Sequence, residues 1–472
     1  MSVRFILNGK AVQVDEIDPH VTLLAWLRGA GLTGSKEGCA EGECGACAVA
    51  VVQSDCNGRP RLTAVNSCLV PLPAVHGQSL VSVEGIAADS GELHPVQVGM
   101  IERGGSQCGY CTPGFVVSLF CEYYRPGRSG YDPESISGNL CRCTGYRPIA
   151  DVARAMPLPD PADERLVMLR ASAPVSPPIT HRSGDHSFVR PKSLAHVFEL
   201  LAKDPGATLL SGGTDLIVYA NQRFERWQTL IALGALPELQ QLEVRVDELV
   251  LGAGVPLAQL EERMRHDPAL HVPMLSTLWP LFSSRLIRNR ATLGGNLGTA
   301  SPIGDSAAAL LALDASLTLS SARADRRVPL REFFLDYRKT RLAPGELIRS
   351  VHIPLPLAPI QRFYKVSKRV LDDISTVAAA FTLALTAEGS IACLRIAYGG
   401  VAATPIRALA VEQLAIGKPW SVDTLRLLLT ELERLGTPLR DHRGSAEYRR
   451  AMLGKLLEKF FAETAQVAEA AQ

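Results

Sequence analysis

The sequence predicts a multidomain protein of the α+β class, and three observations lead to that prediction. The chain has 472 residues, and at about 150 residues per compact unit it should hold about three units. Hydrophobic residues make up 47% and charged residues 21%, a composition typical of globular proteins with several apolar cores. Short β-rich and helical segments alternate along the chain, and ten of the eleven cysteines lie before residue 150. Metal chemistry is therefore expected only in the first third.

Charge and hydropathy exclude several classes of function. Lys and Arg number 49 and Asp and Glu 48, so a net charge of +1 offers no broad basic field to a nucleic acid or an anionic membrane. The N-terminus lacks the pattern of a secretory signal, and no run of about 20 apolar residues predicts a membrane-spanning helix. We therefore expect a cytoplasmic protein, in which reducing conditions leave metal binding or catalysis as the usual roles of cysteine.

The first 85 or so residues are expected to form a small mixed α/β unit. The β-rich runs VRFIL and KAVQV flank Asn8 and Gly9, the dipeptide that most favours a two-residue hairpin turn. The segment TLLAWLRGAG is expected to form a helix closed by Gly31 and is followed by the cysteine-rich loop 36–47 and the β-rich run ACAVAVVQS. These elements surround the cysteine-rich loop.

The following segments divide the rest of the chain. From His94 apolar residues recur at helical spacing, and one helix is predicted with Thr112 as N-cap and Pro113 at its first position. Pro and Ser then replace that periodicity in an expected linker over 158–186. Beyond it lie a ligand-binding part with two glycine-rich loops, SGGTD and LGGNLGTASPIGD, and a third part with the strands YKVSKR, TVAAAFTLALTA and IACLRIAYGG followed by helices.

The first cysteine set has the spacing of a plant-type [2Fe–2S] site. Cys39, Cys44 and Cys47 form C-x4-C-x2-C, and Cys68 follows. Thiolates are soft anionic ligands that suit iron and sulfide, and glycines let loop N–H groups turn toward the sulfurs. The glycines of this loop are Gly38, Gly42 and Gly45. A structural zinc site is the alternative, although such sites usually pair two C-x2-C motifs.

The second set is C-x2-C followed by C-x-C, and by itself it is less specific. It comprises Cys108, Cys111, Cys141 and Cys143. A zinc clasp between two helices would explain this spacing nearly as well. The preceding ferredoxin-type set favours a second redox cluster, because two neighbouring clusters provide an electron path.

The glycine-rich loops could hold a phosphate. Gly212 and Gly213 lie between a β-rich and a helical segment, and Gly294 and Gly295 begin the second loop. Glycine allows close backbone approach, and successive N–H groups form an anion-binding nest. Neither loop matches G-x-G-x-x-G, so a Rossmann fingerprint is not supported, and each loop taken singly could be an ordinary turn.

The cysteine motifs are similar to those of a known family. Segments 107–114, QCGYCTPG, and 139–146, NLCRCTGY, resemble the two-cluster iron–sulfur region of the molybdenum hydroxylases, the xanthine dehydrogenase and aldehyde oxidase family. The resemblance implies that the eight cysteines are cluster ligands. Cys56, Cys121 and Cys393 fall outside the motifs and are expected to be free thiols, with Cys121 packed as a small hydrophobe.

The resemblance extends over the rest of the chain and implies its domains. We expect a β-grasp, ferredoxin-like [2Fe–2S] domain over 1–88, a four-helix [2Fe–2S] domain over 89–157 and the linker over 158–186. An FAD-binding domain of the vanillyl-alcohol-oxidase type should cover 187–357 and a C-terminal α+β flavoprotein domain 358–472.

The family likeness also implies residues that contact FAD. The first pyrophosphate loop corresponds to Thr208, Leu209, Leu210, Ser211, Gly212, Gly213, Thr214, Asp215 and Leu216. The second corresponds to Gly295, Asn296, Thr299, Ser301 and Asp305. Phe282 and Ile348 fall where the family holds the adenine, and Lys365 matches a lysine on the cofactor. The first loop departs from the common G-N-T-E by reading GGTD, and the shorter Asp215 is expected to alter contacts near the nicotinamide.

Four further residues are implied near the isoalloxazine. Asp372 and Asp373 match an acidic pair beside the ring, and Tyr337 and Arg338 match a neighbouring Y-R-K-T segment. On sequence alone the aspartates could equally belong to a solvated turn. If they line the flavin, their charge would disfavour the anionic reduced form and favour hydride transfer to NAD⁺.

The resemblance implies an electron-transfer subunit. The molybdopterin centre of the family is expected on a separate large subunit, so this chain carries no catalytic residue for hydroxylation. It resembles the small subunit of bacterial xanthine dehydrogenases, in which electrons pass through two [2Fe–2S] clusters to FAD and NAD⁺, in a heterotetramer of two small and two large subunits. The alternatives are a subunit of another hydroxylase, acting on an aldehyde or N-heterocycle, and a non-catalytic zinc-bound scaffold. The sequence leaves open the substrate, the oligomer size and the choice between NAD⁺ and oxygen.

Overall fold

The computed structural model describes residues 1–55, 57–88, 90–171 and 176–469, which fall into two compact units. The first unit comprises residues 1–236, 256–259 and 284–291, and the second comprises 237–255, 260–283 and the chain from 292 onward. The five-part division expected from the sequence stays a prediction.

The first unit begins with a mixed five-stranded sheet in the order β2-β1-β5-β3-β4. Its strands are β1 (Val3–Leu7), β2 (Lys10–Val14), β3 (Ala48–Ser54), β4 (Pro60–Asn66) and β5 (Ser79–Val81). The predicted hairpin is confirmed, because Leu7 pairs with Lys10 around Asn8 and Gly9, whose φ angles of 51° and 77° suit this turn. The predicted helix is α1 (Leu23–Gly29), which packs three leucines into the core of this sheet.

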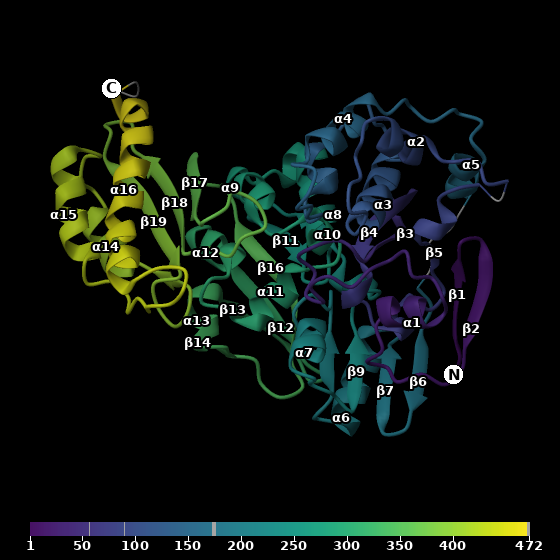
Figure 1. Ribbon diagram of the computed structural model, residues 1–472. Coiled ribbons are helices and arrows are strands. Elements are labelled where there is room, and N and C mark those ends of the chain that lie inside the picture. The colour runs from purple at the N-terminus through teal and green to yellow at the C-terminus, as the bar shows by residue number, and fades with distance from the viewer. Residues whose placement is uncertain (56, 89, 172–175, 470–472) are drawn as a thin grey trace. The chain divides into compact units, whose positions relative to one another are not determined.

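A helical region follows the sheet in the first unit (Figure 1). Its helices are α2 (Pro95–Glu102), α3 (Thr112–Tyr123), α4 (Arg147–Ala155) and α5 (Glu164–Ala171), with a short 3₁₀ turn η4 (Pro133–Ile136). The N-cap assigned to Thr112 is wrong by one residue. Cys111 occupies the cap, so Thr112 is the first helical residue and Pro113 the second rather than the first; the Thr112 hydroxyl donates to Ser106 Oγ at 2.7 Å.

A second sheet of the first unit has the order β6-β7-β9-β8. Its elements are β6 (Ile179–Ser183), β7 (His186–Arg190), α6 (Leu194–Lys203), β8 (Thr208–Leu210), α7 (Leu216–Gln222) and β9 (Thr229–Ala232). The expected linker 158–186 is not free of secondary structure, since it contains α5 and β6. These form because Leu169 reaches a core and β6 pairs with β7 along its length.

The second unit contains a five-stranded sheet in the order β10-β11-β16-β12-β13. Its strands are β10 (Leu242–Val244), β11 (Glu248–Gly252), β12 (Ser316–Ser320), β13 (Asp325–Pro329) and β16 (Leu347–Pro354), and β14 (Phe334–Asp336) pairs with β15 (Lys339–Thr340). The helices of this region are α9 (Pro273–Leu278), α11 (Leu293–Thr299), α12 (Asp305–Ala312) and α13 (Leu330–Phe333). Two further helices, α8 (Leu257–His266) and α10 (Arg285–Arg288), include residues of the first unit.

The second glycine-rich segment is helical, which corrects the expected loop. Residues 293–299 form α11, because Thr292 Oγ1 accepts the N–H of Gly295 at 3.0 Å and Leu293 and Leu297 are buried. Capping and burial outweigh the roughly 1 kcal/mol that each glycine costs a helix. Ala300, with φ of 48°, ends the helix, so only residues 300–304 form a turn before α12.

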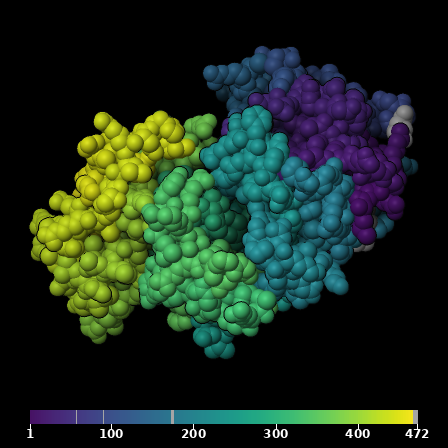
Figure 2. Space-filling model, turned by 90° about the horizontal axis from the view of Figure 1, so that it is seen from below, coloured from purple at the N-terminus to yellow at the C-terminus, as the bar shows by residue number. Residues whose placement is uncertain are grey.

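The C-terminal sheet of the second unit confirms two of the predicted strands and corrects the bounds of the third, because residues 367–369 of YKVSKR lie beyond the strand. Its order is β17-β18-β19-β20, with β17 (Ile360–Val366), β18 (Val377–Leu385), β19 (Ile391–Gly399) and β20 (Ile406–Arg407). Figure 1 shows α14 (Leu409–Ala415), α15 (Val422–Leu432) and α16 (Ala446–Glu469) on one side of this sheet, and Figure 2 shows the yellow C-terminal residues on the face in view.

Strand β18 is buried on both faces. Val377, Ala379 and Phe381 share a core with α14, α15 and α16, and Phe381 stacks on Phe460 at a centroid distance of 4.8 Å. The intervening residues face α12, to whose Ala312 carbonyl Thr382 Oγ1 donates at 3.2 Å. This explains why the segment VAAAFTLAL is apolar throughout rather than alternating. Among the described residues, no helix combines the length and the apolar character needed to span a membrane.

The cap of α2 predicts a pH-dependent stability. His94 is buried. Its ring Nδ1 accepts the backbone N–H of Val96 at 3.2 Å, and its backbone N–H donates to Gln97 Oε1 at 2.9 Å. Burial lowers the pKa of the His94 ring to about 4. The folded state therefore binds fewer protons than the unfolded state between about pH 4 and 6.5, and stability falls as the pH decreases through that window. In the wild-type protein, the contribution of His94 should lower the free energy of unfolding by about 1 kcal/mol when the pH falls from 7 to 5.5.

His94→Asn keeps a side chain that can cap α2 but removes the titration. Urea unfolding of the full chain under anaerobic conditions, followed by circular dichroism at both pH values, should show a smaller pH effect in the variant. Equal pH effects in the two proteins would contradict the assignment.

Candidate functional site

The first cysteine set lies between α1 and β3 and in the 3₁₀ turn η1 (Ser67–Leu69). The thiols make contact in two pairs, Cys39 with Cys44 and Cys47 with Cys68. Cys44 N–H donates to Cys39 Sγ at 3.4 Å, while the thiol of Cys47 donates to Asn66 Oδ1 at 3.8 Å. The contact with the Cys44 side chain is the largest cause that lowers the pKa of the Cys39 thiol to about 5, with backbone N–H groups adding to it, and the same contact raises the pKa of Cys44. The loop therefore favours a thiolate at Cys39.

The second cysteine set lies at the ends of two helices. Cys108 and Cys111 precede α3, and Cys141 and Cys143 precede α4. The thiols again make contact in pairs, Cys108 with Cys143 and Cys111 with Cys141. Thr144 donates both its N–H, at 3.4 Å, and its hydroxyl, at 3.1 Å, to Cys141 Sγ. These donors would stabilise negative charge on the sulfur.

The paired arrangement fits two-iron clusters better than zinc. In a tetrahedral zinc site with Zn–S bonds of about 2.3 Å, all four sulfurs lie about 3.8 Å apart. Within the part of the chain that the structure describes, no three cysteine sulfurs lie within 4.8 Å of one another. A [2Fe–2S] cluster takes two thiolates on each of two irons, so contacts in pairs suit it. The donor set and its arrangement are consistent with two such clusters.

A group of Asp18, His20 and His186 also has ligand atoms within 4.8 Å of one another. His20 Nε2 accepts the N–H of Trp227 at 3.0 Å, so the ring proton is on Nδ1, which lies 2.8 Å from Asp18 Oδ1. Asp18 Oδ2 lies 2.8 Å from His186 Nδ1. Both nitrogens of His20 are thus used in hydrogen bonds, and this group is a polar linkage rather than a metal site.

The loops of the two cysteine sets are in backbone contact. Leu140 N–H, beside Cys141, donates to the carbonyl of Cys44 at 3.0 Å. Gly45 has φ of +67°, and a Cβ there would lie 2.3 Å from the carbonyl oxygen of Gly138. A Cβ on Gly114, which follows Cys111, would lie 2.1 Å from the carbonyl oxygen of Gly45. These positions therefore require glycine.

Asn139 completes this contact. Its side chain is buried, donates to the Gly45 carbonyl at 3.3 Å and accepts the Ser118 hydroxyl at 2.7 Å. Tyr110, between Cys108 and Cys111, donates its hydroxyl to the carbonyl of Glu37 in the other loop. Polar side chains of the helical region thus position the backbone of the first cysteine loop.

Helix α7 contacts the other side of the first cysteine loop. Asn221 Nδ2 lies 2.9 Å from the carbonyl oxygens of both Ala40 and Cys68, and Gln222 Nε2 lies 2.9 Å from that of Cys39. Helix α7 begins directly after the first predicted pyrophosphate loop. Helix α7 therefore connects the first predicted pyrophosphate loop to the backbone around Cys39 and Cys68.

The first predicted pyrophosphate loop is a turn, 211–215, between β8 and α7, as the sequence predicted. Of its predicted residues Leu210 and Gly213 are buried, Asp215 is exposed, and the remaining ones are half-buried: Thr208, Leu209, Ser211, Gly212, Thr214 and Leu216. A Cβ on Gly212 would lie 2.1 Å from the Arg290 carbonyl oxygen. The packing of the turn against Arg290 therefore already requires glycine at this position. Gly213, with φ of +81°, approaches the carbonyl of Leu69 beside Cys68.

The predicted residues of the second unit include a buried ion pair. Lys365 Nζ lies 3.0 Å from Asp305 Oδ2 and donates to the carbonyl of Leu281 at 2.7 Å, and Ser375 Oγ donates to Asp305 Oδ1 at 2.6 Å. Burial raises the pKa of Asp305, and the ammonium of Lys365 opposes that shift. The structure brings these two predicted residues together, and their charges compensate each other.

The other predicted residues of this unit lie close by in sequence. Gly295, Asn296 and Thr299 are on α11, where Asn296 Oδ1 accepts the Ser306 hydroxyl and Thr299 Oγ1 donates to the Gly295 carbonyl at 3.0 Å. Ser301 lies in the following turn. Ile348 is buried on β16, and Phe282 is half-buried with its ring 6.3 Å from that of Trp279. Their roles toward FAD stay predictions.

The predicted flavin-side residues occupy two surface turns of the second unit. Asp373 accepts the N–H groups of Arg369 at 2.8 Å and Ile374 at 3.0 Å; burial opposes these bonds, but together they lower its pKa. Asp372 is half-buried with φ of 51°. Tyr337 and Arg338 lie in the turn between β14 and β15, with the guanidinium 5.7 Å from the ring centroid. Their predicted roles are not tested by these contacts.

Two cysteines outside the motifs are free thiols. Cys121 is buried in the core of the helical region, which confirms its predicted packing, and burial raises its pKa. Cys393 is half-buried on β19. Cys56 lies outside the described residues.

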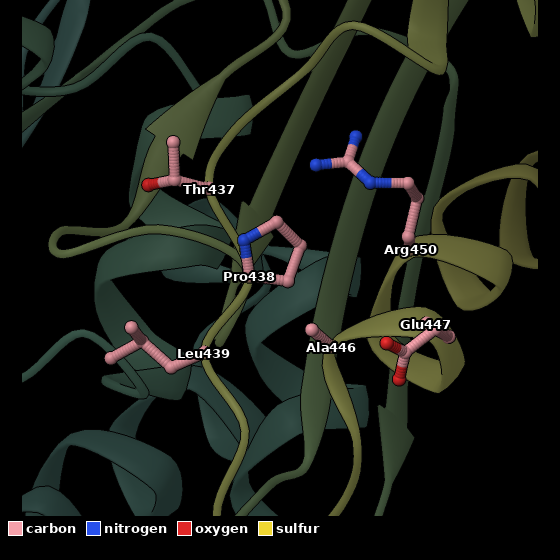
Figure 3. Close-up of a pocket in the computed structure, with 6 residues that line it drawn as sticks. All are labelled: Thr437, Pro438, Leu439, Ala446, Glu447 and Arg450. Carbon is pink, nitrogen blue, oxygen red and sulfur yellow. The ribbon is translucent and has the colours of Figure 1, made fainter.

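A shallow pocket in the second unit contains none of the predicted residues (Figure 3). It is lined by Thr437, Pro438, Leu439, Ala446, Glu447 and Arg450. Figure 3 shows Arg450 beside the loop, where its guanidinium donates to backbone carbonyls including those of Glu433 and Leu435. The pocket brings no redox or phosphate-binding group together.

Four family models match successive parts of the chain. A 2Fe-2S iron–sulfur cluster binding domain matches residues 5–72, and a [2Fe-2S] binding domain matches 82–154. An FAD binding domain in molybdopterin dehydrogenase matches 183–356, and a CO dehydrogenase flavoprotein C-terminal domain matches 362–464. The chain belongs to the molybdenum hydroxylase family. The expected fold class, with two [2Fe–2S] domains, an FAD-binding domain and a C-terminal flavoprotein domain, is confirmed.

Curated relatives match almost the whole chain. A xanthine dehydrogenase of Emericella nidulans is 31% identical over 99% of this chain and 39% of its own length, and aldehyde oxidase 2 of Cavia porcellus is 32% identical over 98% of this chain and 40% of its own. The chain spans about two fifths of the length of these relatives. Substrates and partners of the whole protein are therefore matters for proposal.

Solved structures match more than half of the chain. A carbon monoxide dehydrogenase of Hydrogenophaga pseudoflava is 27% identical with a TM-score of 0.54, covering 58% of this chain and 94% of that one. A quinoline 2-oxidoreductase of Pseudomonas putida 86 gives the same identity and TM-score, covering 59% and 96%. These two similar structures are thus named for different substrates, carbon monoxide and quinoline.

Gly45 provides a test of the contact between the cysteine loops. Gly45→Ala should destabilise the full chain through its positive φ, by about 1 kcal/mol, and through overpacking against Gly138, by about 1–3 kcal/mol more. Gly31→Ala is the matched control, because Gly31 has φ of +86° and nothing lies within 4 Å of its Cβ position. Chemical unfolding under anaerobic conditions measures the difference. Equal losses of unfolding free energy in the two variants would mean that the close contact between the loops at Gly45 does not contribute to stability.

Proposed function

We propose that this chain is the electron-transfer part of an NAD⁺-dependent xanthine dehydrogenase. In this proposal a molybdenum-binding large subunit oxidises hypoxanthine to xanthine and xanthine to urate, each step with one oxygen from water, and the two electrons of each step pass one at a time through the helical-domain cluster and the ferredoxin-like cluster to FAD. NAD⁺ then takes a hydride from reduced FAD, and one proton is released. Two small and two large subunits form the proposed heterotetramer.

The observation that best supports this order is the position of the first cysteine loop. Its Cys44 carbonyl accepts the N–H beside Cys141, so the two cysteine sets are connected through one hydrogen bond. On its other side Asn221 and Gln222 of α7 hold its carbonyls, and α7 follows the turn proposed to bind FAD. A chain of contacts in the order helical set, first set, flavin loop is what such a relay needs.

A second candidate function differs only in substrate. The similarity to an aldehyde oxidase and to a quinoline 2-oxidoreductase supports an equivalent subunit of a hydroxylase for an aldehyde or an N-heterocycle. The zinc scaffold is disfavoured by the contacts of the cysteines in pairs. Co-purification of the large subunit and assay of the complex with xanthine, aldehydes and quinoline would distinguish the two enzymes.

The assignment of eight cysteines predicts two separate clusters. Anaerobically purified and reduced protein should give two distinguishable [2Fe–2S] electron paramagnetic resonance signals. Cys44→Ser should remove one signal and Cys141→Ser the other, because each change leaves an incomplete ligand set. Cys121→Ser, which alters a buried thiol outside both sets, is the control and should keep both signals. Stoichiometric zinc with little iron, or loss of the same signal in both ligand variants, would contradict the assignment.

The proposed exit of electrons predicts a separable NADH activity. The folded chain should pass electrons from NADH to an artificial dye through FAD, but should oxidise xanthine only with the molybdenum subunit. In the complex, replacing Asp372 and Asp373 by Ala should reduce NAD⁺ reduction more than dye reduction, since a dye need not dock a nicotinamide.

Asp423→Ala is the control for this experiment, since its side chain is 91% exposed on α15. Equal losses with NAD⁺ and dye in the double variant would remove the two aspartates from the NAD⁺ site. Xanthine oxidation by the chain alone would overturn the assignment of subunits.

A further inference from the structure

Three parallel strands of the second sheet in the first unit end at one edge. β7 and β8 both pair in parallel with β9, and the carboxyl ends of the three strands are at Arg190, Leu210 and Ala232. The turn 211–215 leaves from this edge. Ligands of open α/β sheets bind beyond the carboxyl ends of parallel strands, because successive turns converge there.

Two arginines near this edge lack a carboxylate partner. Arg190 is 4% exposed, and its guanidinium donates only to carbonyls, those of His76 and Pro177 at 2.9 Å and that of Ala74 at 2.5 Å. Arg290 donates its Nε–H to the Gly212 carbonyl at 3.1 Å. No described acidic residue forms an ion pair with either, so each arginine's charge is uncompensated among the described residues.

The electrostatics of Arg290 agree with that geometry. Burial alone lowers its pKa to about 10, and the nearby charge of Arg290 adds to burial in lowering the pKa of Arg190. Removing a charge from water is costly unless an opposite charge compensates it. Of Arg290, only Nε has a partner among the described residues, so its two Nη groups are available to an anion.

We propose that Arg290 binds the diphosphate of a dinucleotide seated on the turn 211–215, with Arg190 contributing positive charge behind it. A planar guanidinium can donate both Nη groups to phosphate oxygens, and successive backbone N–H groups of the turn can form an anion-binding nest beside it. This inference rests on the proposed FAD site and adds the group that neutralises the ligand's charge. Arg290 is thus a binding residue fixed to the loop through Gly212.

The test measures FAD affinity rather than turnover. Flavin-free protein with its iron retained is titrated with FAD and with riboflavin, which lacks phosphate, by quenching of flavin fluorescence at low and high salt. Arg290→Gln should raise the Kd for FAD at least about tenfold, as expected for a lost charge-assisted hydrogen bond, and should flatten the salt dependence. Riboflavin binding should not change, and Arg290→Lys should fall between.

Arg182→Gln is the matched control. Arg182 is exposed on β6 and pairs with Ser187, at the opposite end of β7 from Arg190, so the same loss of charge should leave FAD affinity unchanged. Unchanged FAD affinity in Arg290→Gln, or equal losses for FAD and riboflavin, would overturn the proposal. Failure of wild type to bind FAD would instead overturn the proposed function.

A second measurement needs no variant. Wild-type protein is treated with phenylglyoxal, which modifies arginine, and the modified sites are identified by mass spectrometry. FAD and adenosine diphosphate should protect Arg290, whereas riboflavin should not. Modification of Arg290 at the same rate in the presence and absence of FAD would overturn the proposal.

Discussion

The backbones of the two cysteine loops approach each other so closely that no side chain fits between them. The local structure depends on this close approach. Gly45 and Gly114 lie so close to neighbouring carbonyls that a Cβ on either would overlap them. The hydrogen bond from Leu140 to Cys44 needs this approach, since an amide must come within about 3 Å of its acceptor. Glycine therefore determines how closely the two proposed clusters can lie, while Asn139 holds the loops in place through its two hydrogen bonds.

Charge compensation separates two kinds of charged site in this chain. In the second unit, Lys365 and Asp305 neutralise each other, with Ser375 and a carbonyl satisfying further hydrogen bonds. In the first unit, the partners of Arg190 and Arg290 within the described part of the chain are carbonyls. Because carbonyl dipoles do not cancel a full charge, the first arrangement is complete within the protein, whereas the second favours an anion from outside.

The sequence predicted the elements whose signals are local. Spacing alone identified the cysteine sets, Asn8 and Gly9 predicted the hairpin, and apolar runs predicted β18 and β19. Contacts between distant segments leave no such signal, so the roles of Asn139, Asn221 and Arg290 were not predicted. Asn139 is nevertheless the first residue of the motif NLCRCTGY. The glycines of α11 misled the prediction, because a cap at Thr292 and burial of two leucines decide that segment. A cap residue before a glycine pair was the available signal.

The first cysteine loop has two distinct sides, and this asymmetry favours one direction for the proposed relay. On one side, Cys44 and Gly45 meet the helical region, whose Cys108 and Cys143 are exposed. On the other, the carbonyls of Cys39 and Cys68 meet α7, and Cys47 and Cys68 are each only 2% exposed. An external donor can therefore approach the second cysteine set but not the buried pair of the first. Electrons that enter at the exposed sulfurs and leave through the turn before α7 would pass both cysteine sets in sequence, so the local packing supports the helical set as the entrance.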